Sequence, residues 1–354
     1  MRILNRLHRL TARPRSRSGA NDGDADRMVD EIHQLTDMNR RERDRGRERR
    51  LVELRYEAFR GRRVGGELQE SSEVIEDLFP GQLVPEVSSA DFTVEHLRSA
   101  ITHHGSVHVH GLARREQVER LTTDIDNAFD AFDAHAGGEP RPDLDGWYRP
   151  FKHRMITDQD RVRKRSRGNL LAFESPPALF DLIETMNEVG VGELARGYLS
   201  EPPAILARKV TLRRMGHDFG GGWHQDGAFM GSGIRSLNVW LALTHCGDTA
   251  PGLDVVGRRF DQLLPTGNGA YAAWGIKPED AERAGAGVTV RPIFEAGDAL
   301  IFDHMCLHRT GTDKGMTNGR YAIETWFFAP STYGAMTTEI NDGYSPRDQV
   351  PLVF

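Results

Sequence analysis

The sequence predicts a double-sheet, all-β core with α-helices packed outside it. The second half of the chain is rich in short apolar runs separated by Gly, Pro and Asp, which is typical of strands joined by turns. Helical spacing of apolar residues dominates the first 200 positions instead. At 354 residues with 38% hydrophobic content, the chain is long enough to bury one large core. The strand-like runs are SLNVWLALTHC, LDVVG, VTVRPIF, DALIFDHMCLH and RYAIETWFFAP.

Residues 1–64 are expected to form an Arg-rich arm that is partly helical. The first 63 residues hold 18 Arg and no Lys against 11 acidic residues. Blocks of mixed sign usually have no specific nucleic-acid partner, so none is expected. We expect one or two helices, a folded core that does not need the arm, and a role for the arm in any homo-oligomer. Apolar residues recur at helical spacing at Met28, Ile32, Leu35, Leu51, Leu54 and Ala58.

A linker, residues 65–90, and a compact domain, residues 91–335, are expected to follow the arm. The domain opens with FTVEHLRSAITHHGSVHVHGL, a pattern typical of a helix, a Gly-containing turn and a strand. Further helices are predicted over 113–132 and 176–199, and a strand over 205–215. Residues 137–168, rich in Gly, Pro and Arg, are predicted to form a long insert of loops. Residues 336–354 are expected to form a C-terminal tail.

His108 and His110 form a tempting pair of metal ligands. They alternate along one predicted strand, so their side chains share one face of it. A metal site usually has three or more protein ligands, and no third candidate stands near these two in the sequence. The pair is therefore interpreted as structural.

Composition limits the classes of partner and compartment. The net charge of -6 offers no general attraction to nucleic acid. Cys246 and Cys306 are the only cysteines, too few for a disulfide framework, so a reducing, cytoplasmic location is expected. No uninterrupted apolar stretch of about 18 residues occurs, so no membrane-spanning helix is expected.

The segment GGGWHQDGAF carries two candidate metal ligands, His224 and Asp226. They are two residues apart, so on extended backbone both side chains leave the same face. A second histidine, His308, ends a later predicted strand in AGDALIFDHMCLHRTG. Two histidines and one carboxylate on one face of an octahedron leave three positions open, which suits iron(II) with a bidentate 2-oxo acid and dioxygen. The glycine run lacks the Lys-Ser/Thr pair of a phosphate loop, and we expect it to let backbone approach the metal-bearing strand.

Arg320 is a candidate anchor for an anionic ligand at the same site. It follows His308 by 12 residues, on the returning strand of a predicted hairpin. An arginine can hold a carboxylate through two parallel hydrogen bonds while keeping its charge in a buried pocket. Thr310 would offer a hydroxyl to the same carboxylate.

Residues 91–330 resemble the phytanoyl-CoA dioxygenase family of iron(II)/2-oxoglutarate oxygenases. The resemblance runs from FTVEHLRSAITHHGSVHVHGL through WHQDGAF and SLNVWLAL to GDALIFDHMCLHRTG and NGRYAIETWFF. It implies a double-stranded β-helix, which is a jelly-roll fold similar to that of cupins. It also implies that Arg320 and Thr310 bind 2-oxoglutarate and that Trp240 packs near this cosubstrate. The metal ligands that it implies are His224, Asp226 and His308.

Three residues are candidates for contact with a small-molecule substrate. The family resemblance favours Arg208, while Gln225 and Phe229 are adjacent in sequence to the predicted metal ligands. The long insert would favour an anionic group on the substrate if it covers the pocket. Its cations are Arg149, Lys152 and Arg154.

The sequence therefore predicts an Fe(II)/2-oxoglutarate-dependent dioxygenase that hydroxylates a small organic or natural-product molecule, releasing succinate and CO2. Asp226 argues against a related halogenase, in which a small residue replaces the carboxylate. Desaturation or ring formation would use the same ligands and stays open. An alternative of another class is a non-catalytic β-sandwich that binds metal or sugar or serves as a scaffold. Iron-dependent succinate production would distinguish the enzyme from that alternative.

Overall fold

The structure, a computed structural model, describes residues 22–61, 74–139, 141–153, 156–267, 269–335 and 350–354. The predictions for residues 1–21, 62–73, Arg154 and 336–349 lie outside these residues. The helices are α1 (Asp22–Arg41), α2 (Arg45–Gly61), α3 (Val94–His104), α4 (Arg115–Gly137), α5 (Asp158–Ser166), α6 (Pro176–Glu188), α7 (Val191–Leu199), α8 (Gly227–Met230) and α9 (Pro278–Ala284). The strands are β1 (Glu86–Ser88), β2 (Ser106–His110), β3 (Asn169–Leu171), β4 (Ala204–Leu206), β5 (Thr211–Met215), β6 (Ser236–Ala242), β7 (Gly252–Val256), β8 (Thr289–Val290), β9 (Ala299–Phe302), β10 (His308–Gly311), β11 (Arg320–Phe328) and β12 (Pro351–Val353).

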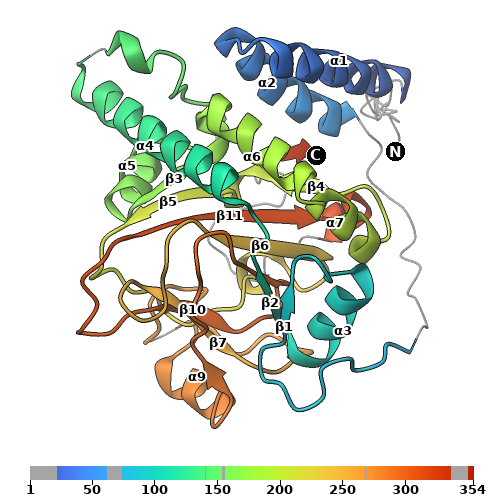
Figure 1. The fold of residues 1–354 in the computed structure, drawn as a ribbon, viewed down its shortest axis with the longest axis vertical. Helices are drawn as coiled ribbons and strands as arrows, with labels where there is room; N and C mark the ends of the chain where they lie inside the picture. The colour runs from blue at the N-terminus through green and yellow to red at the C-terminus, as the bar shows by residue number, and fades with distance from the viewer. Residues whose placement is uncertain (1–21, 62–73, 140, 154–155, 268, 336–349) are drawn as a thin grey trace, which may run out of the picture.

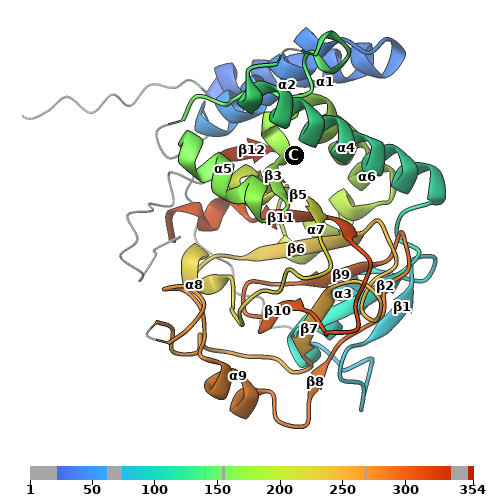
Figure 2. The same cartoon turned by 90° about the vertical axis from the view of Figure 1, so that its left-hand side faces the viewer.

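The strands form two sheets that lie one above the other (Figures 1 and 2). The large sheet has the order β1-β2-β9-β6-β11-β4-β12, with β5 also paired to β11 and β3 paired to β5. The small sheet has the order β10-β7-β8. At the centre of the large sheet, β6 and β11 pair antiparallel over seven residues, from Ala322 opposite Ala242 to Phe328 opposite Ser236. Every residue of β6 is buried, as expected of a central strand covered on both faces.

The fold is mixed α/β, and the predicted all-β core was therefore overstated. Of the described residues, 42% are in helices and 19% in strands. Helices α1, α2, α4 and α6 stack on the side of the large sheet that faces away from the small one (Figure 1). Their apolar faces belong to the same core as the strands, with Leu54, Leu121 and Phe129 at most 1% exposed. The β-rich pattern was interpreted correctly, but the helical half of the chain supplies core residues as well as cover.

Helix α2 is part of the main core. Its apolar face buries Leu54, Ala58 and Phe59, which are at most 2% exposed, and it packs against α6 and β12. The buried guanidinium of Arg55 donates a hydrogen bond of 2.9 Å to the backbone oxygen of Val353 in β12. This packing argues against the expectation that the core folds without residues 1–63.

Two short strands lie in segments that were predicted to be irregular. In the expected linker, β1 pairs parallel with β2, with Glu86 opposite His108. In the expected C-terminal tail, β12 pairs antiparallel with β4. The insert 137–168 contains α5, so it is partly helical. The other domain boundaries stay predictions. Among the described helices, none is long and apolar enough to cross a bilayer.

Candidate active site

The structure brings His224, Asp226 and His308 together, as the sequence predicted. One ligand atom from each can be chosen so that all three lie within 4.8 Å of one another. His308 begins β10, and the backbone of His224 pairs with it through two hydrogen bonds of 3.0 Å. Asp226 differs from the expected geometry because its backbone is helical (φ -65°, ψ -22°) and leads into α8. A turn, rather than extended backbone, therefore directs its carboxylate toward the two imidazoles.

The glycine run before His224 lies against β10, as expected. The backbone N–H of Gly221 donates to the oxygen of Thr310 at 3.0 Å. A Cβ at Gly221 would lie 3.2 Å from the Thr310 nitrogen, and one at Gly222 would lie 2.2 Å from Cβ of Tyr271. A side chain at Gly221 would crowd the β10 backbone and one at Gly222 would displace Tyr271, so glycine at these positions favours the close approach of this segment to β10.

Hydrogen bonds orient both imidazoles for metal binding. Nδ1 of His224 donates to the backbone oxygen of Gly222 at 2.9 Å, and Nδ1 of His308 donates to that of Cys306 at 3.1 Å. In neutral histidines, these bonds leave a lone pair on each Nε2. The Nε2 atoms lie 3.7 Å and 3.9 Å from the two carboxylate oxygens of Asp226. Three ligand atoms thus face one point between them.

The electrostatics of the triad fit a divalent cation. Burial lowers the pKa of His224 to about 3 and also lowers the pKa of His308, so both rings are neutral ligands. Burial and the nearby Glu324 carboxylate raise the pKa of Asp226 to about 8. Oδ2 of Asp226 is buried and has no hydrogen-bond partner among the described residues. A cation would satisfy this atom and favour the ionised carboxylate.

Arg320 supplies a buried positive charge near the triad. The side chain is fully buried and its Nη1 donates to the backbone oxygens of Pro251 and Gly252, each at 2.9 Å. Its guanidinium carbon lies 5.1 Å from the ring centroid of Trp240. Within the described part of the chain, Nε of Arg320 and Nε1 of Trp240 have no hydrogen-bond partner, and no carboxylate forms an ion pair with Arg320. Burial lowers the pKa of Arg320 to about 10, so it stays charged at neutral pH.

Thr310 lies close to the backbone that Arg320 contacts. In the small sheet, Thr310 pairs with Leu253 and Gly311 pairs with Gly252, whose oxygen accepts from Arg320. Arg320, Trp240 and Thr310 therefore form a region in which two buried N–H donors lack partners. The donor set fits the far carboxylate of 2-oxoglutarate.

Sequence reasoning missed a partly buried carboxylate, Glu324, beside the triad. It forms an ion pair with Arg213 and accepts hydrogen bonds from Nε1 of Trp326 at 3.0 Å and from Nδ2 of Asn238 at 3.3 Å. Burial alone would raise its pKa, but Arg213 lowers it to about 2, so Glu324 is ionised. The signal was present in the sequence, because Glu324 lies four residues after Arg320 and both therefore face the same side of β11.

A cavity of about 410 Å³ adjoins the triad and is rich in cations. Two of its aromatic residues also approach His224, with ring-centroid distances of 6.4 Å for Phe229 and 5.1 Å for Trp274. In Figure 2, α5 and α8, which contribute to the cavity, lie on the same side of the molecule. Five cations and one acid are among the residues that line it: Asp160, Arg163, Lys164, Arg167, Asn169, Arg208, Lys209, Phe229, Tyr271, Ala272, Ala273 and Trp274.

The predicted substrate residues divide into two groups. Arg208 and Phe229 line this cavity. Gln225 is fully buried elsewhere, because its amide donates to the oxygen of Met305 at 2.8 Å and accepts from the nitrogen of Leu264 at 2.7 Å. Its role in the structure is to connect two loops behind the triad.

The cations of the insert 137–168 line two different cavities. Helix α5 brings Arg163 and Lys164 to the cavity. Arg149 and Lys152 instead line a different cavity beside Tyr56 of α2. The condition under which these cations would favour an anionic substrate, that their loop covers the active-site pocket, is therefore not met by Arg149 and Lys152.

Trp274 was not predicted, because the Gly- and Ala-rich segment around it has neither helical nor strand periodicity.

Comparison with solved structures finds similar chains of low sequence identity. AviO1 from Streptomyces viridochromogenes is 16% identical, with a TM-score of 0.43, over 66% of this chain and 94% of that one. EvdO2 from Micromonospora carbonacea, complexed with 2-oxoglutarate, is 15% identical, with a TM-score of 0.45, over 66% and 89%. EctD from S. alaskensis, with 2-oxoglutarate and 5-hydroxyectoine, is 15% identical, with a TM-score of 0.48, over 67% and 76%.

No curated protein matches the chain. The sequence model of the phytanoyl-CoA dioxygenase (PhyH) family matches residues 101–317, which is more than half of the chain and includes His224, Asp226 and His308. The chain therefore belongs to the phytanoyl-CoA dioxygenase family and is an enzyme of the iron- and 2-oxoglutarate-dependent oxygenases.

Proposed function

We propose that this protein hydroxylates a small organic substrate that carries an anionic group, using iron(II), 2-oxoglutarate and dioxygen. The observation that carries the proposal is the triad itself, in which two neutral imidazoles and one carboxylate direct their free lone pairs to a common point. His224, Asp226 and His308 would hold the metal. When bound, the iron and 2-oxoglutarate supply the oxidation: one oxygen atom of O2 enters the substrate C–H bond, and the other enters succinate as CO2 leaves.

The chain's own residues position the cosubstrate. Arg320 would bind the far carboxylate of 2-oxoglutarate through its partnerless Nε, with Thr310 offering a hydroxyl and Trp240 packing alongside. The two backbone oxygens that accept from Nη1 fix the guanidinium plane before the ligand arrives, so little side-chain entropy is lost on binding. Because Arg320 and Trp240 are buried, water competes poorly for the same hydrogen bonds.

The cation-rich cavity supports an anionic substrate. Arg163, Arg167 and Arg208 and two lysines line it against the single carboxylate of Asp160. Such an excess attracts negative charge and raises the local concentration of an anion. Phe229 and Trp274 offer apolar surface between these cations and His224, so the substrate would present a carbon centre to the metal and its anionic group to α5.

The proposal is tested by the yield of succinate from iron-loaded, full-length protein. A panel of small carboxylates and phosphate esters is compared with neutral analogues of matched size. We expect extra succinate with anionic members of the panel, and a product that has gained one oxygen atom by mass spectrometry. The matched control is the Asp226→Ala variant, which should give no extra succinate.

The alternatives give different products. Desaturation would yield a product that has lost two hydrogen atoms, and ring formation would also leave the oxygen count unchanged. Absence of succinate with every substrate and with 2-oxoglutarate alone would contradict the proposed oxidation as a whole. Turnover of neutral analogues only would contradict the anionic-substrate proposal while leaving the oxygenase intact.

A further inference from the structure

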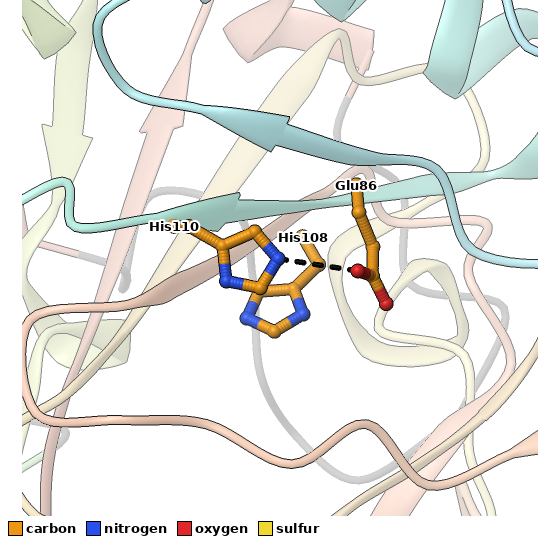
Figure 3. Close-up of side chains that lie close together, drawn as sticks. All are labelled: Glu86, His108 and His110. Atoms are coloured by element: carbon orange, nitrogen blue, oxygen red, sulfur yellow. Dashed lines mark hydrogen bonds and ion pairs between the residues drawn. The ribbon is translucent and has the colours of Figure 1, made fainter.

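We propose that the protein binds a second metal ion, Zn²⁺, at Glu86, His108 and His110, on the edge of the large sheet and outside the catalytic triad. Figure 3 shows the two imidazoles and the carboxylate close together. One ligand atom from each can be chosen so that all lie within 4.8 Å of one another. Glu86 is the third ligand that the sequence could not reveal, because parallel pairing of β1 with β2 brings it opposite His108 from 22 residues away.

The distances suit a metal ion after a small adjustment. Nε2 of His110 lies 3.2 Å from Oε2 of Glu86. Two ligand atoms at about 2.0 to 2.1 Å from a tetrahedral Zn²⁺ are roughly 3.3 Å apart, so this pair already has the required spacing. The side chains of His110 and Glu86 are 45% and 62% exposed, which leaves them free to close on an ion and leaves a coordination position open to water.

His108 is held in the tautomer that a metal ligand needs. Its ring is only 1% exposed, and Nε2 lies 3.3 Å from Oδ2 of Asp298. An Nε2–H that donates to this carboxylate leaves a lone pair on Nδ1. Nδ1 of His108 is buried and has no hydrogen-bond partner among the described residues. This unsatisfied acceptor is the observation that points to a missing ligand.

Asp298 completes the arrangement as an outer carboxylate. It accepts hydrogen bonds from the backbone N–H of Gly111 at 2.8 Å and of Glu295 at 2.9 Å. Metal-binding histidines commonly donate their second ring N–H to such a carboxylate, which fixes the ring and makes it a better ligand.

The donor set favours zinc over the metal of the catalytic triad. Two imidazole nitrogens and one carboxylate oxygen, with one position open to water, form a usual zinc site. In a nitrogen and oxygen site of given geometry, Zn²⁺ binds more tightly than Fe²⁺. The ion would join β1, which pairs with β2 alone, to the rest of the sheet.

The test measures zinc binding to the untagged, full-length chain carrying His224→Ala and Asp226→Ala, which disables the triad. The protein is stripped of metal with a chelator and dialysed against micromolar Zn²⁺, and bound zinc is counted by elemental analysis. We expect one zinc per chain in this background. Adding His110→Ala should weaken binding at least 100-fold, and adding Asp298→Asn should weaken it about 10- to 100-fold.

The matched control is His245→Ala. His245 is also partly exposed and lies between two carboxylates, Asp248 at 2.7 Å and Glu295 at 3.0 Å, so it represents adventitious binding by a surface histidine. Zinc should remain at one per chain in this variant. Because His110 is exposed, its removal should leave the circular dichroism spectrum unchanged. Absence of zinc from the starting background, or retention of the same affinity after His110→Ala, would overturn the proposal.

A second readout separates the proposed site from loose surface binding. Zinc bound between β1 and β2 binds the folded state only, so it should raise the melting temperature of the starting background. The same zinc concentration should leave the melting temperature unchanged once His110→Ala is present. An equal rise in both proteins would locate the bound zinc elsewhere and contradict the proposal.

Discussion

Replacing Arg320 with alanine should separate cosubstrate binding from metal binding. Arg320 is fully buried and has no carboxylate partner among the described side chains, so its charge is available to 2-oxoglutarate. Removing one partner of a buried charge-assisted pair costs roughly 2 to 5 kcal/mol, because the remaining carboxylate is left without a partner. At 1.4 kcal/mol per tenfold, this corresponds to about a 30- to 4,000-fold loss of affinity. Iron should still bind, because the triad is unchanged.

The assay is an anaerobic titration of the iron-loaded protein with 2-oxoglutarate. Binding is measured by the metal-to-ligand charge-transfer absorbance band of the iron complex with 2-oxoglutarate. Arg320→Lys should restore affinity only in part, since lysine keeps the charge but loses the planar fork. Arg283→Ala is the control, because Arg283 is exposed and pairs with Asp280 on α9. Arg320→Ala also removes the donor for the oxygens of Pro251 and Gly252, so the melting temperature is measured in parallel.

Unchanged affinity in a folded, iron-bound Arg320→Ala protein would refute this reasoning. Another cation would then hold the cosubstrate, and Arg208 would be the first candidate to test. A loss of iron together with 2-oxoglutarate would instead mean that Arg320 supports the triad as a whole.

Three further predictions concern the metal, the cavity and the N-terminal helices. Asp226→Ala should abolish substrate oxidation and weaken iron binding, and full turnover by this variant without added carboxylate would contradict the triad. Burial and the cations Lys209 and Arg208 lower the pKa of Lys164 to about 7. The positive charge of Lys164 is therefore present below pH 7 and lost above it. Because this charge attracts an anionic substrate, the KM for such a substrate should rise above pH 7. Lys164→Met should remove that rise, whereas a rise of the same size in the variant would exclude Lys164 as its source. Leu54→Ala should lower the free energy of unfolding by about 2 to 5 kcal/mol in a denaturant titration, since this side chain is fully buried. Met38→Ala, at an exposed position of α1, should change it by less than about 0.5 kcal/mol, and equal effects would show that α2 does not belong to the core.

The grouping of His224, Asp226 and His308 was predictable because its signals are local. The short interval between His224 and Asp226, and the strand before His308, are features of the sequence itself. The reason given for the first interval was nevertheless incomplete, since Asp226 has helical backbone. A two-residue spacing restricts where side chains point, but tertiary contacts decide which backbone conformation delivers them.

Features that depend on strand pairing could not be derived in the same way. Glu86 approaches His108 only because β1 adds in parallel to the edge of the sheet. The contribution of α2 to the core depends on its contacts with α6 and β12, which are distant in sequence. Glu324 is the intermediate case, because alternation along β11 placed it on the same face as Arg320, but only the structure shows that this face lies near the triad.

The contact between α2 and β12 has a consequence for the order of folding. Arg55 and the backbone oxygen of Val353 are 298 residues apart in sequence, so their hydrogen bond closes a very large loop. Closing such a loop costs conformational entropy before the contact can stabilise the folded state. Contacts between residues that are far apart in sequence therefore slow folding. The apolar face of α2 therefore remains without its full covering until the last strand has joined β4. During that interval, Leu54 and Phe59 are open to association with other unfolded chains, which makes this helix the stretch to protect when the protein is refolded.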